Sequence, residues 1–275
     1  MATSLRSAIV DARSSAIPPA TNRPSGAGVW ALGWIEARRM LLHPSFLVGM
    51  GFGLLVLRGA IGAGGPSSSV IENTRWLFLG AFVGLVVGTV LSANVAAVRP
   101  RRSGVRELFG STPAPGETIT AAAFAGLLLG PVLIATVLTA LGWWVLRGDP
   151  DIRPYLDVFL AVQIPVAIAA LGSIGIAVGR WIPSLLGGPL VIVAHVFTPL
   201  LWAVPWILPS QELESGSLGG SGVTWHLIYL GAAITTWVAI AFARDRRTFL
   251  RAAIAASALV LGIVAAFQQV PEGGW

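Results

Sequence analysis

The chain contains no cysteine and, although 18 of its 275 residues are basic, no lysine. The absence of cysteine excludes disulfide bonds, thiolate metal sites and a cysteine nucleophile. The absence of lysine excludes a phosphate-binding P-loop, because a lysine reaches the nucleotide phosphates in that motif. The chain therefore binds no ATP in that manner. A basic set made only of arginine is typical of a GC-rich genome.

Charge of either sign is also scarce. Only 11% of the residues are charged and 55% are hydrophobic, whereas an ordinary soluble domain has about 25% charged residues. A soluble fold of this composition would expose large apolar patches. Seven apolar stretches are each about long enough to cross a bilayer, and they predict spans near 46–63, 76–98, 120–146, 155–179, 185–208, 225–243 and 250–268. The net charge of +6 then describes membrane orientation, and we expect no nucleic-acid partner.

Arginine falls mainly in alternate gaps between these stretches. The arginines of these gaps and of the N-terminal segment are Arg99, Arg101, Arg102, Arg106, Arg180, Arg244, Arg246, Arg247 and Arg251, with Arg6, Arg13, Arg23, Arg38 and Arg39 before the first span. If every span is real, all of them lie on one side of the membrane, and excess arginine marks the cytoplasmic side. The pattern predicts a multi-pass protein of the bacterial cell membrane with a cytoplasmic N-terminus and an extracellular C-terminus.

The segments outside the spans differ in character. Residues 1–28 have no apolar core run, which excludes a cleavable signal sequence and predicts a flexible cytoplasmic tail. In residues 29–44, Trp30 and Trp34 alternate with Glu36 and Arg38 at roughly helical spacing. This pattern predicts an amphipathic helix in the lipid headgroup layer, with a simple extension of the first span as the alternative. Residues 45–268 form the expected transmembrane domain, and 269–275 form a C-terminal tail.

Glycine and proline indicate how the spans pack. Glycine pairs at small-xxx-small spacing let helix backbones approach closely in a bundle; they are Gly49 and Gly53, Gly84 and Gly88, Gly126 and Gly130, and Gly175 and Gly179. Pro189, Pro199 and Pro205 each remove a backbone donor from the fifth span. We therefore expect a kinked or broken helix there.

The segment 99–117, between the second and third spans, is too polar to cross a membrane. Residues 104–109 are compatible with a helix, and Ser111, Thr112, Pro113 and Pro115 break it. A short amphipathic helix flanked by cations on the cytoplasmic face is a surface for a partner.

This segment resembles the coupling segment of type 2 ATP-binding-cassette (ABC) exporter permeases. In that family a basic pair is followed by glycine, by glutamate with an apolar neighbour, and by proline before the next span. The matching residues here, in order, are Arg101, Arg102, Gly104, Glu107, Leu108 and Pro113. The N-terminal amphipathic helix also looks like the family's interfacial elbow, with Arg38, Arg39, Leu41, His43 and Pro44 at its end. The resemblance extends through about residue 243.

The resemblance implies an all-α polytopic bundle of six to seven spans with an elbow helix and a cytoplasmic coupling helix. It implies a second permease subunit, identical or not, and a separate ATP-binding subunit that carries ATP and magnesium, with no cofactor on this chain. The expected ATPase contact is made by Arg101, Arg102, Arg106, Glu107 and Leu108. Two departures are the seventh apolar run, since the family usually has six spans, and the apolar residues 121–123 where a basic residue often begins the third span.

Few polar residues lie inside the spans, where an ionisable group costs about 2.5–3.5 kcal/mol. His195 lies near the middle of the fifth span and, with Gln163 and Asn94, is a candidate for a substrate path; helix packing is the other interpretation of His195. No carboxylate lies near the centre of any span, which disfavours proton- or sodium-coupled transport.

Two other functions stay open. The chain could be a non-transporting anchor or regulatory subunit of a larger complex. Ser173 and His195 could suggest an intramembrane serine protease, but the sequence around Ser173 does not fit that family's GxSG motif. The favoured function is export of a hydrophobic or amphipathic substrate, with membrane lipid around the bundle.

Overall fold

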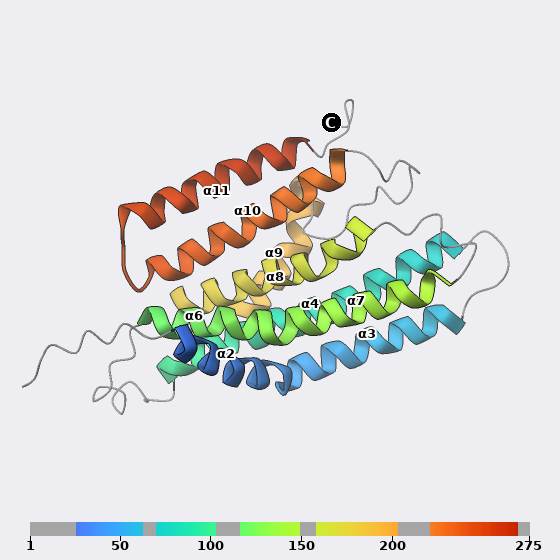
Figure 1. Ribbon diagram of the computed structural model, residues 1–275, viewed down its shortest axis with the longest axis horizontal. Coiled ribbons are helices and arrows are strands. Elements are labelled where there is room, and N and C mark those ends of the chain that lie inside the picture. Colours follow the sequence, from blue (N-terminus) through green and yellow to red (C-terminus); the bar gives the residue numbers. More distant parts are fainter. Residues whose placement is uncertain (1–25, 63–69, 103–115, 149–157, 203–220, 269–275) are drawn as a thin grey trace, which may run out of the picture.

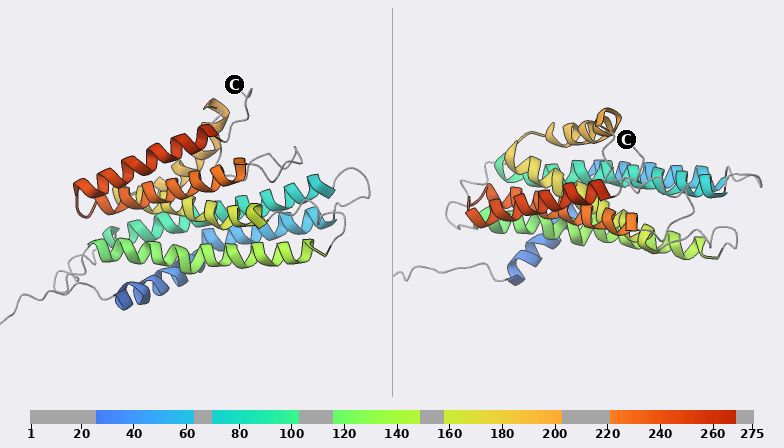
Figure 2. Two further views of the ribbon diagram at one scale, coloured as in Figure 1. Left: turned by 45° about the horizontal axis from the view of Figure 1, so that its top comes forward. Right: turned by 90° about the horizontal axis from the view of Figure 1, so that it is seen from above.

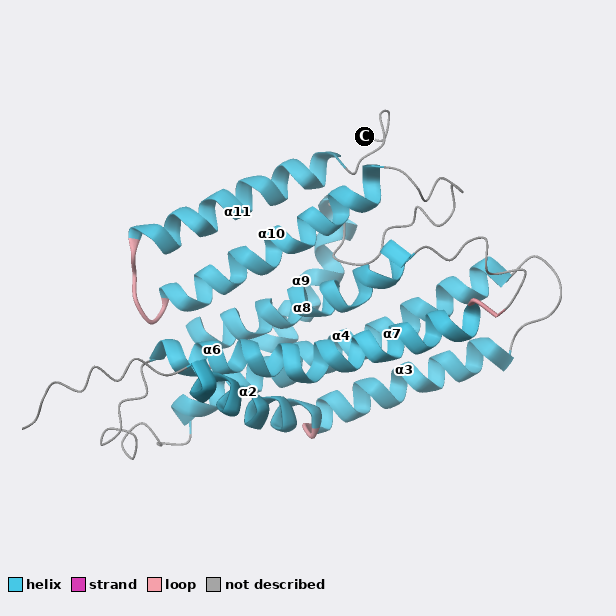
Figure 3. Ribbon diagram, in the orientation of Figure 1, coloured by secondary structure: helices cyan, strands magenta, loops and turns pink. Residues whose placement is uncertain are grey.

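The computed structural model describes residues 26–62, 70–102, 116–148, 158–202 and 221–268. All regular structure in these ranges is helical (Figure 3). The helices are α2 (Gly26–Leu41), α3 (Pro44–Gly62), α4 (Val70–Arg102), α6 (Gly116–Leu127), α7 (Leu133–Leu146), α8 (Val158–Trp181), α9 (Gly187–Trp202), α10 (Ser221–Ala243) and α11 (Phe249–Gln268). A five-residue π-helical segment, η2 (Leu128–Val132), joins α6 to α7 without a break. The expected all-α class is confirmed.

Each of the seven predicted spans overlaps a described helix, and parts of the spans 46–63, 155–179 and 185–208 lie outside the described residues. Five described helical segments are long and apolar enough to cross a membrane: Phe82–Pro100, Gly116–Trp144, Ala161–Trp181, Thr224–Ala243 and Phe249–Gln268. The chain is therefore a multi-pass membrane protein. A count of six to seven spans stays a prediction, because the side chains of α3 and α9 are described over only part of each helix.

The second predicted span is shorter than the helix that contains it. Helix α4 begins at Val70 and continues through Pro100 to Arg102, so the first residues assigned to the coupling segment are helical. The apolar run marks the thickness of the hydrocarbon layer, whereas the hydrogen-bonded helix continues into the polar region beyond it. The missing donor of Pro100 costs only one backbone bond close to the helix end.

The N-terminal amphipathic helix is present, but it begins three residues earlier than predicted and ends at Leu41. A turn at residues 42–43 separates it from α3, so α2 is no simple extension of the first span. It leans out from the long helices (Figure 2). Its small residues face the bundle, since a Cβ on Gly33 would meet Ala125 and Gly126 abuts Glu36 and Ala37. Trp30 and Trp34, 54% and 62% exposed, face outward, as expected for a helix in the headgroup layer.

Backbone contacts through glycine hold neighbouring helices together, as the small-xxx-small spacing predicts. Helices α3 and α4 touch through Gly49, Gly84 and Gly88, where an added Cβ would meet backbone atoms of the other helix. Helix α8 approaches α4 in the same way, with Gly175 against Val90. Close approach increases van der Waals contact, which drives helix association where lipid removes the hydrophobic effect.

Helix α8 lies at the centre of the bundle, beside α4, α7 and α10 (Figure 1). Residues 167–177 are all buried, which explains why this stretch is apolar on every face. Helix α11 lies at the edge, packed on α10, and its buried residues are Ala258, Gly262 and Ala265. That α11 is a helix appended to a six-span bundle stays a prediction.

Proline coincides with an irregular helical segment in the third predicted span. In the fifth, the described helix α9 continues through Pro189 and Pro199. Pro189 lies in the first turn of α9, where backbone N–H groups have no intrahelical acceptor. Pro205 lies outside the described residues. The irregular segment is η2, which contains the buried Pro131. Pro131 cannot donate to Leu127, and the N–H of Leu133 donates to the carbonyl of Leu128 in the π-helical manner.

Candidate functional site at the arginine-rich end

The up-and-down helix order brings four segments to one end of the bundle, on the left in Figure 1. They are the end of α4, the start of α6, the end of α8 and the turn between α10 and α11. The predicted alternation of arginine therefore corresponds to one physical end, which we call the arginine-rich end. Among the described residues of these segments, its arginines are Arg99, Arg101, Arg102, Arg180, Arg244, Arg246, Arg247 and Arg251.

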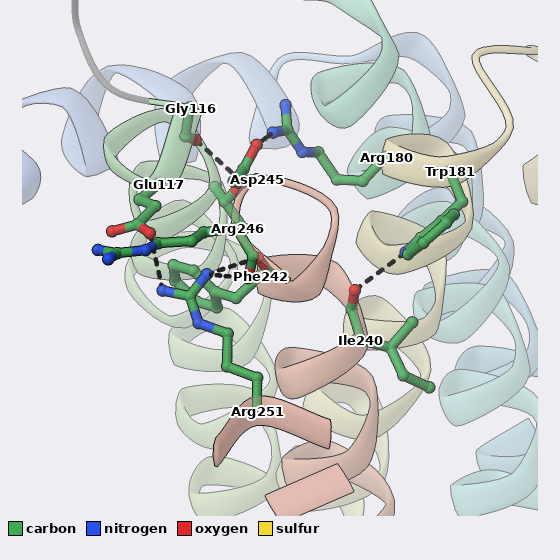
Figure 4. Close-up of polar contacts among 10 residues, drawn as sticks. Gly116, Glu117, Arg180, Trp181, Ile240, Phe242, Asp245, Arg246 and Arg251 are labelled. Carbon is green, nitrogen blue, oxygen red and sulfur yellow. Dashed lines mark hydrogen bonds and ion pairs between the residues drawn. The ribbon is translucent and has the colours of Figure 1, made fainter. Parts of the chain in front are cut away.

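A buried ion pair joins the end of α8 to the α10–α11 turn. The Arg180 guanidinium donates to the Asp245 carboxylate, and the two side chains are only 6% and 9% exposed. The other Asp245 oxygen accepts the Thr120 hydroxyl of α6 at 2.5 Å. Asp245 also lies against Gly116, where a Cβ would come within 2.5 Å of its Oδ1 (Figure 4). One carboxylate therefore joins the α10–α11 turn to both α6 and α8.

A second, more exposed pair lies beside the first. Arg251 of α11 donates to the Glu117 carboxylate of α6 at 2.8 Å. The same guanidinium donates to the backbone carbonyls of Phe242, at 2.8 Å, and Arg246, at 3.0 Å. Arg251 thus closes the α10–α11 turn on itself and attaches it to the first turn of α6 (Figure 4).

Trp181 makes a further contact between α8 and α10. Its indole N–H donates to the carbonyl of Ile240 at 2.9 Å, and the Arg244 guanidinium lies over its ring at 5.5 Å from the centroid. The last turn of α8 is therefore held to α10 by Trp181 and to the following turn by Arg180.

These residues connect the helix ends to one another. The side chains that meet are guanidinium, carboxylate, hydroxyl and indole groups. No group of three or more metal-binding side chains occurs among the described residues. The burial of Arg180 and Asp245 makes their pairing important, because an isolated charge at such a site is costly.

A third polar group attaches α2 to α4 at the same end. The Glu36 carboxylate lies 2.6 Å from Arg39 and 3.7 Å from Arg99. In the turn that follows α2, Nδ1 of His43 accepts the Ser45 N–H at 3.3 Å, which caps α3 immediately before its first-position proline. Burial first, and then the charge of Arg99, lowers the pKa of His43.

Most of the predicted ATPase contact falls outside the description. Arg106, Glu107 and Leu108 lie outside the described residues. Arg101 and Arg102 form the last turn of α4, and their side chains are not described. The predicted coupling helix is therefore untested, although both ends of its segment are located.

Two of the three predicted substrate-path residues, Asn94 and Gln163, lie far from each other. Asn94 is buried beside Gly179, and its Nδ2 donates to the carbonyl of Ser184 at 3.2 Å, which ties the α8–α9 turn to α4. Gln163 is also buried but precedes Gly179 by 16 residues, roughly 24 Å along α8. His195 lies on α9, and only its backbone is described.

Ser173 is accounted for by helix packing. Its side chain is buried in α8, and its hydroxyl donates to the carbonyl of Ala169, one turn earlier, at 2.7 Å. Serine in membrane helices commonly forms this bond.

Sequence reasoning missed Thr120, Asp245 and Glu117 as contact residues. A signal was present: Asp245 stands alone among four arginines between residues 244 and 251, and Glu117 is the acidic residue at the start of α6. A lone acidic residue within a basic cluster at a helix end is a candidate partner for an arginine from elsewhere in the fold.

No family model, no curated protein and no solved structure matches this chain.

Proposed function

We propose that this chain is the membrane-spanning permease subunit of an ABC exporter, moving a hydrophobic or amphipathic substrate by alternating access. A separate ATPase subunit docks at the arginine-rich end and supplies the energy. The proposal starts from the resemblance of the segment 99–117, with Arg101, Arg102, Glu107 and Leu108, to the coupling segment of such permeases.

One observation carries the proposal beyond that resemblance. The segment 103–115 is joined directly to α4 at Arg102 and to α6 at Gly116. The first turns of α6 are bonded to α11 and to Asp245 of the α10–α11 turn, and Asp245 in turn pairs with Arg180 of α8. A force applied to this segment therefore reaches four helices within about one helical turn. Rigid-body rocking of packed helices is how such a displacement opens one side of a bundle and closes the other.

The orientation follows from charge. Because positively charged residues accumulate on cytoplasmic loops, the arginine-rich end faces the cytoplasm, where an ATPase would be found. The exposed Trp30 and Trp34 then lie at the inner headgroup layer. In this arrangement the N-terminus is cytoplasmic, seven spans put the C-terminus outside, and two permease subunits assemble with two ATPase subunits.

The chemistry of the interior supports an externally powered transporter. No aspartate or glutamate lies near the centre of any span, and ion-coupled carriers usually bind their ion with such a residue. The buried polar groups Asn94 and Gln163 are uncharged. An apolar bundle without internal carboxylates suits a substrate that is itself largely apolar.

Co-purification from the native membrane tests the proposal. An affinity-tagged chain is extracted in mild detergent, and the bound fraction is assayed for ATP hydrolysis and analysed by mass spectrometry. We expect an ABC-type ATPase with the wild-type chain and at least tenfold less of it with Glu107→Lys. Arg147→Glu, an equal charge reversal at the other end of the bundle, is the matched control and should retain the ATPase. A wild-type chain that carries no nucleotide-hydrolysing subunit would refute the proposal, and an ATPase bound without substrate movement would favour the regulatory-subunit alternative.

A further inference from the structure

We infer that Asp245 is the positioning residue that transmits displacement of the first turns of α6 to α8 and to the α10–α11 hairpin. The inference rests on the proposed function, because it concerns how an ATPase-driven movement crosses the bundle. It assigns this role to the Thr120–Asp245–Arg180 contact, which none of the sequence motifs includes.

The first step is the contact between α6 and the turn. The Thr120 hydroxyl has one hydrogen and two acceptors, the Gly116 carbonyl at 3.1 Å and the Asp245 carboxylate at 2.5 Å. The shorter bond to the charged acceptor is the stronger. The same carboxylate lies against Gly116, the first residue of α6, where the positive end of the helix dipole favours an anion. The start of α6 therefore contacts the Asp245 carboxylate at two residues, Gly116 and Thr120.

The second step is the contact between the turn and the centre of the bundle. Asp245 pairs with Arg180, the penultimate residue of α8, and both side chains are almost fully buried. Helix α8 is the most enclosed helix and contacts α4, α6, α7, α9 and α10. A movement of Asp245 relative to Arg180 would leave charged groups unpaired in a buried site, so the two move together.

The third step compares the buried Asp245–Arg180 pair with the more exposed Glu117–Arg251 pair beside it. The Glu117–Arg251 pair joins α6 to α11 one turn away, but Glu117 is 40% exposed and Arg251 is 22% exposed. A solvent-exposed pair tolerates separation because water replaces the lost partner. Asp245 is buried and lacks that replacement by water. Among the acidic residues that the structure describes at this end, it is the one that bonds to both α6 and α8.

The test uses the complete complex of the chain with its co-purifying ATPase in lipid nanodiscs. The chain contains no cysteine, so Arg147→Cys and Thr224→Cys place two spin labels at the end opposite Asp245, one after α7 and one on α10. Complexes without these cysteines define the background signal of the ATPase. The distance between the labels is measured with and without ATP and vanadate, and ATP hydrolysis is measured in parallel.

We expect a nucleotide-dependent change of distance in the wild-type background. Thr120→Val keeps the side-chain shape but removes the donor, and it should reduce that change at least twofold while ATPase binding and hydrolysis stay within twofold of the wild-type values. Thr120→Ser restores the hydroxyl and should restore the response. Glu117→Gln should leave it unchanged. Gly116→Ala, which pushes a methyl group toward Asp245, gives a second variant if Thr120→Val assembles poorly.

The outcomes separate the two proposals. If Thr120→Val and Gly116→Ala both respond as the wild type does, or if the wild-type labels do not move although ATP is hydrolysed, the role of Asp245 is refuted and the ATPase-driven function is not. If no ATPase accompanies the wild-type chain, the proposed function fails, and this inference fails with it.

Discussion

The contact between α3 and α4 allows a direct test of the packing argument. A Cβ added at Gly88 would lie 2.9 Å from the Cα of Phe46 and 3.0 Å from the carbonyl oxygen of Ser45. Ordinary van der Waals contact begins near 3.4 Å, and both atoms belong to the backbone. Gly88→Ala can therefore be accommodated only if the two helices separate by about half an ångström, since close-packed interiors yield little.

The size of the effect follows from two opposing terms. Overpacking a well-packed contact costs about 1–3 kcal/mol, whereas alanine is favoured over glycine within a helix by about 1 kcal/mol. Gly51 of α3 offers a matched control, because a Cβ there meets nothing within 4 Å. Gly51→Ala gains the helix term alone, so the difference in unfolding free energy between the two variants isolates the overpacking term, about 1–3 kcal/mol.

The assay is unfolding of the purified protein in mixed micelles with increasing SDS, followed by circular dichroism. Gly88→Ala should unfold at a lower SDS fraction than Gly51→Ala. Equal midpoints for the two variants would show that the helices are not held in backbone contact at Gly88, and the packing account of α3 and α4 would be wrong.

Three further predictions concern polar contacts. The pKa of His43 is lowered from 6.5 in the folded protein, so the unfolded chain binds more protons than the folded chain near this pH. Thermal stability should therefore fall as the pH drops below about 6.5 and level off below the folded pKa. The pH dependence of stability should be weaker in His43→Asn, because asparagine can cap α3 without titrating. Asn94→Leu removes the hydrogen bonds that its Nδ2 donates to the carbonyls of Ser184 and Leu185. If their net contribution is about 1 kcal/mol, amides of the α8–α9 turn should exchange hydrogen roughly fivefold faster by mass spectrometry, with the α10–α11 turn unchanged. Arg180→Ala leaves Asp245 buried without its partner and should lower the unfolding free energy by about 3–5 kcal/mol in the SDS assay, whereas Glu117→Gln, at an exposed pair, should lower it by less than about 1 kcal/mol.

The helices were largely predictable because lipid imposes one requirement on every span. A run of about 20 apolar residues must form a helix, since no water is present to satisfy the backbone. The predicted limits of the last two spans, 225–243 and 250–268, agree with α10 and α11 to within four residues. The start of α4 at Val70 and its continuation to Arg102 were missed. A hydropathy pattern identifies the part of a helix inside the hydrocarbon layer and gives no information on the part that extends beyond it.

The site was less predictable, because it depends on contacts between residues distant in sequence. Thr120 and Asp245 are separated by 125 positions, and nothing local to either residue identifies the other. The effect of a proline was also hard to predict, because it depends on where the proline lies within its helix. Pro189 and Pro131 both lie in apolar runs, but Pro189 lies in the first turn of α9 and Pro131 in the middle of a continuous helix. Grouping Asn94 with Gln163 by polarity alone ignores their positions along the helices, and those positions separate the two side chains.

The π-helical segment η2 has a consequence for how the third span could change by insertion or deletion. A regular α-helix rotates about 100° for each residue, and a π-helical turn holds one residue more than an α-helical turn. Removal of one residue between Leu128 and Val132 would therefore let the helix become regular while keeping the orientation of α7, because the wide turn loses only its extra residue. Removal of one residue from the regular helix α6 would instead turn everything after it by about 100°. The outward face that carries Trp144, 72% exposed, would thus stay outward after a single-codon deletion in η2 but would rotate toward its neighbours after the same deletion in α6.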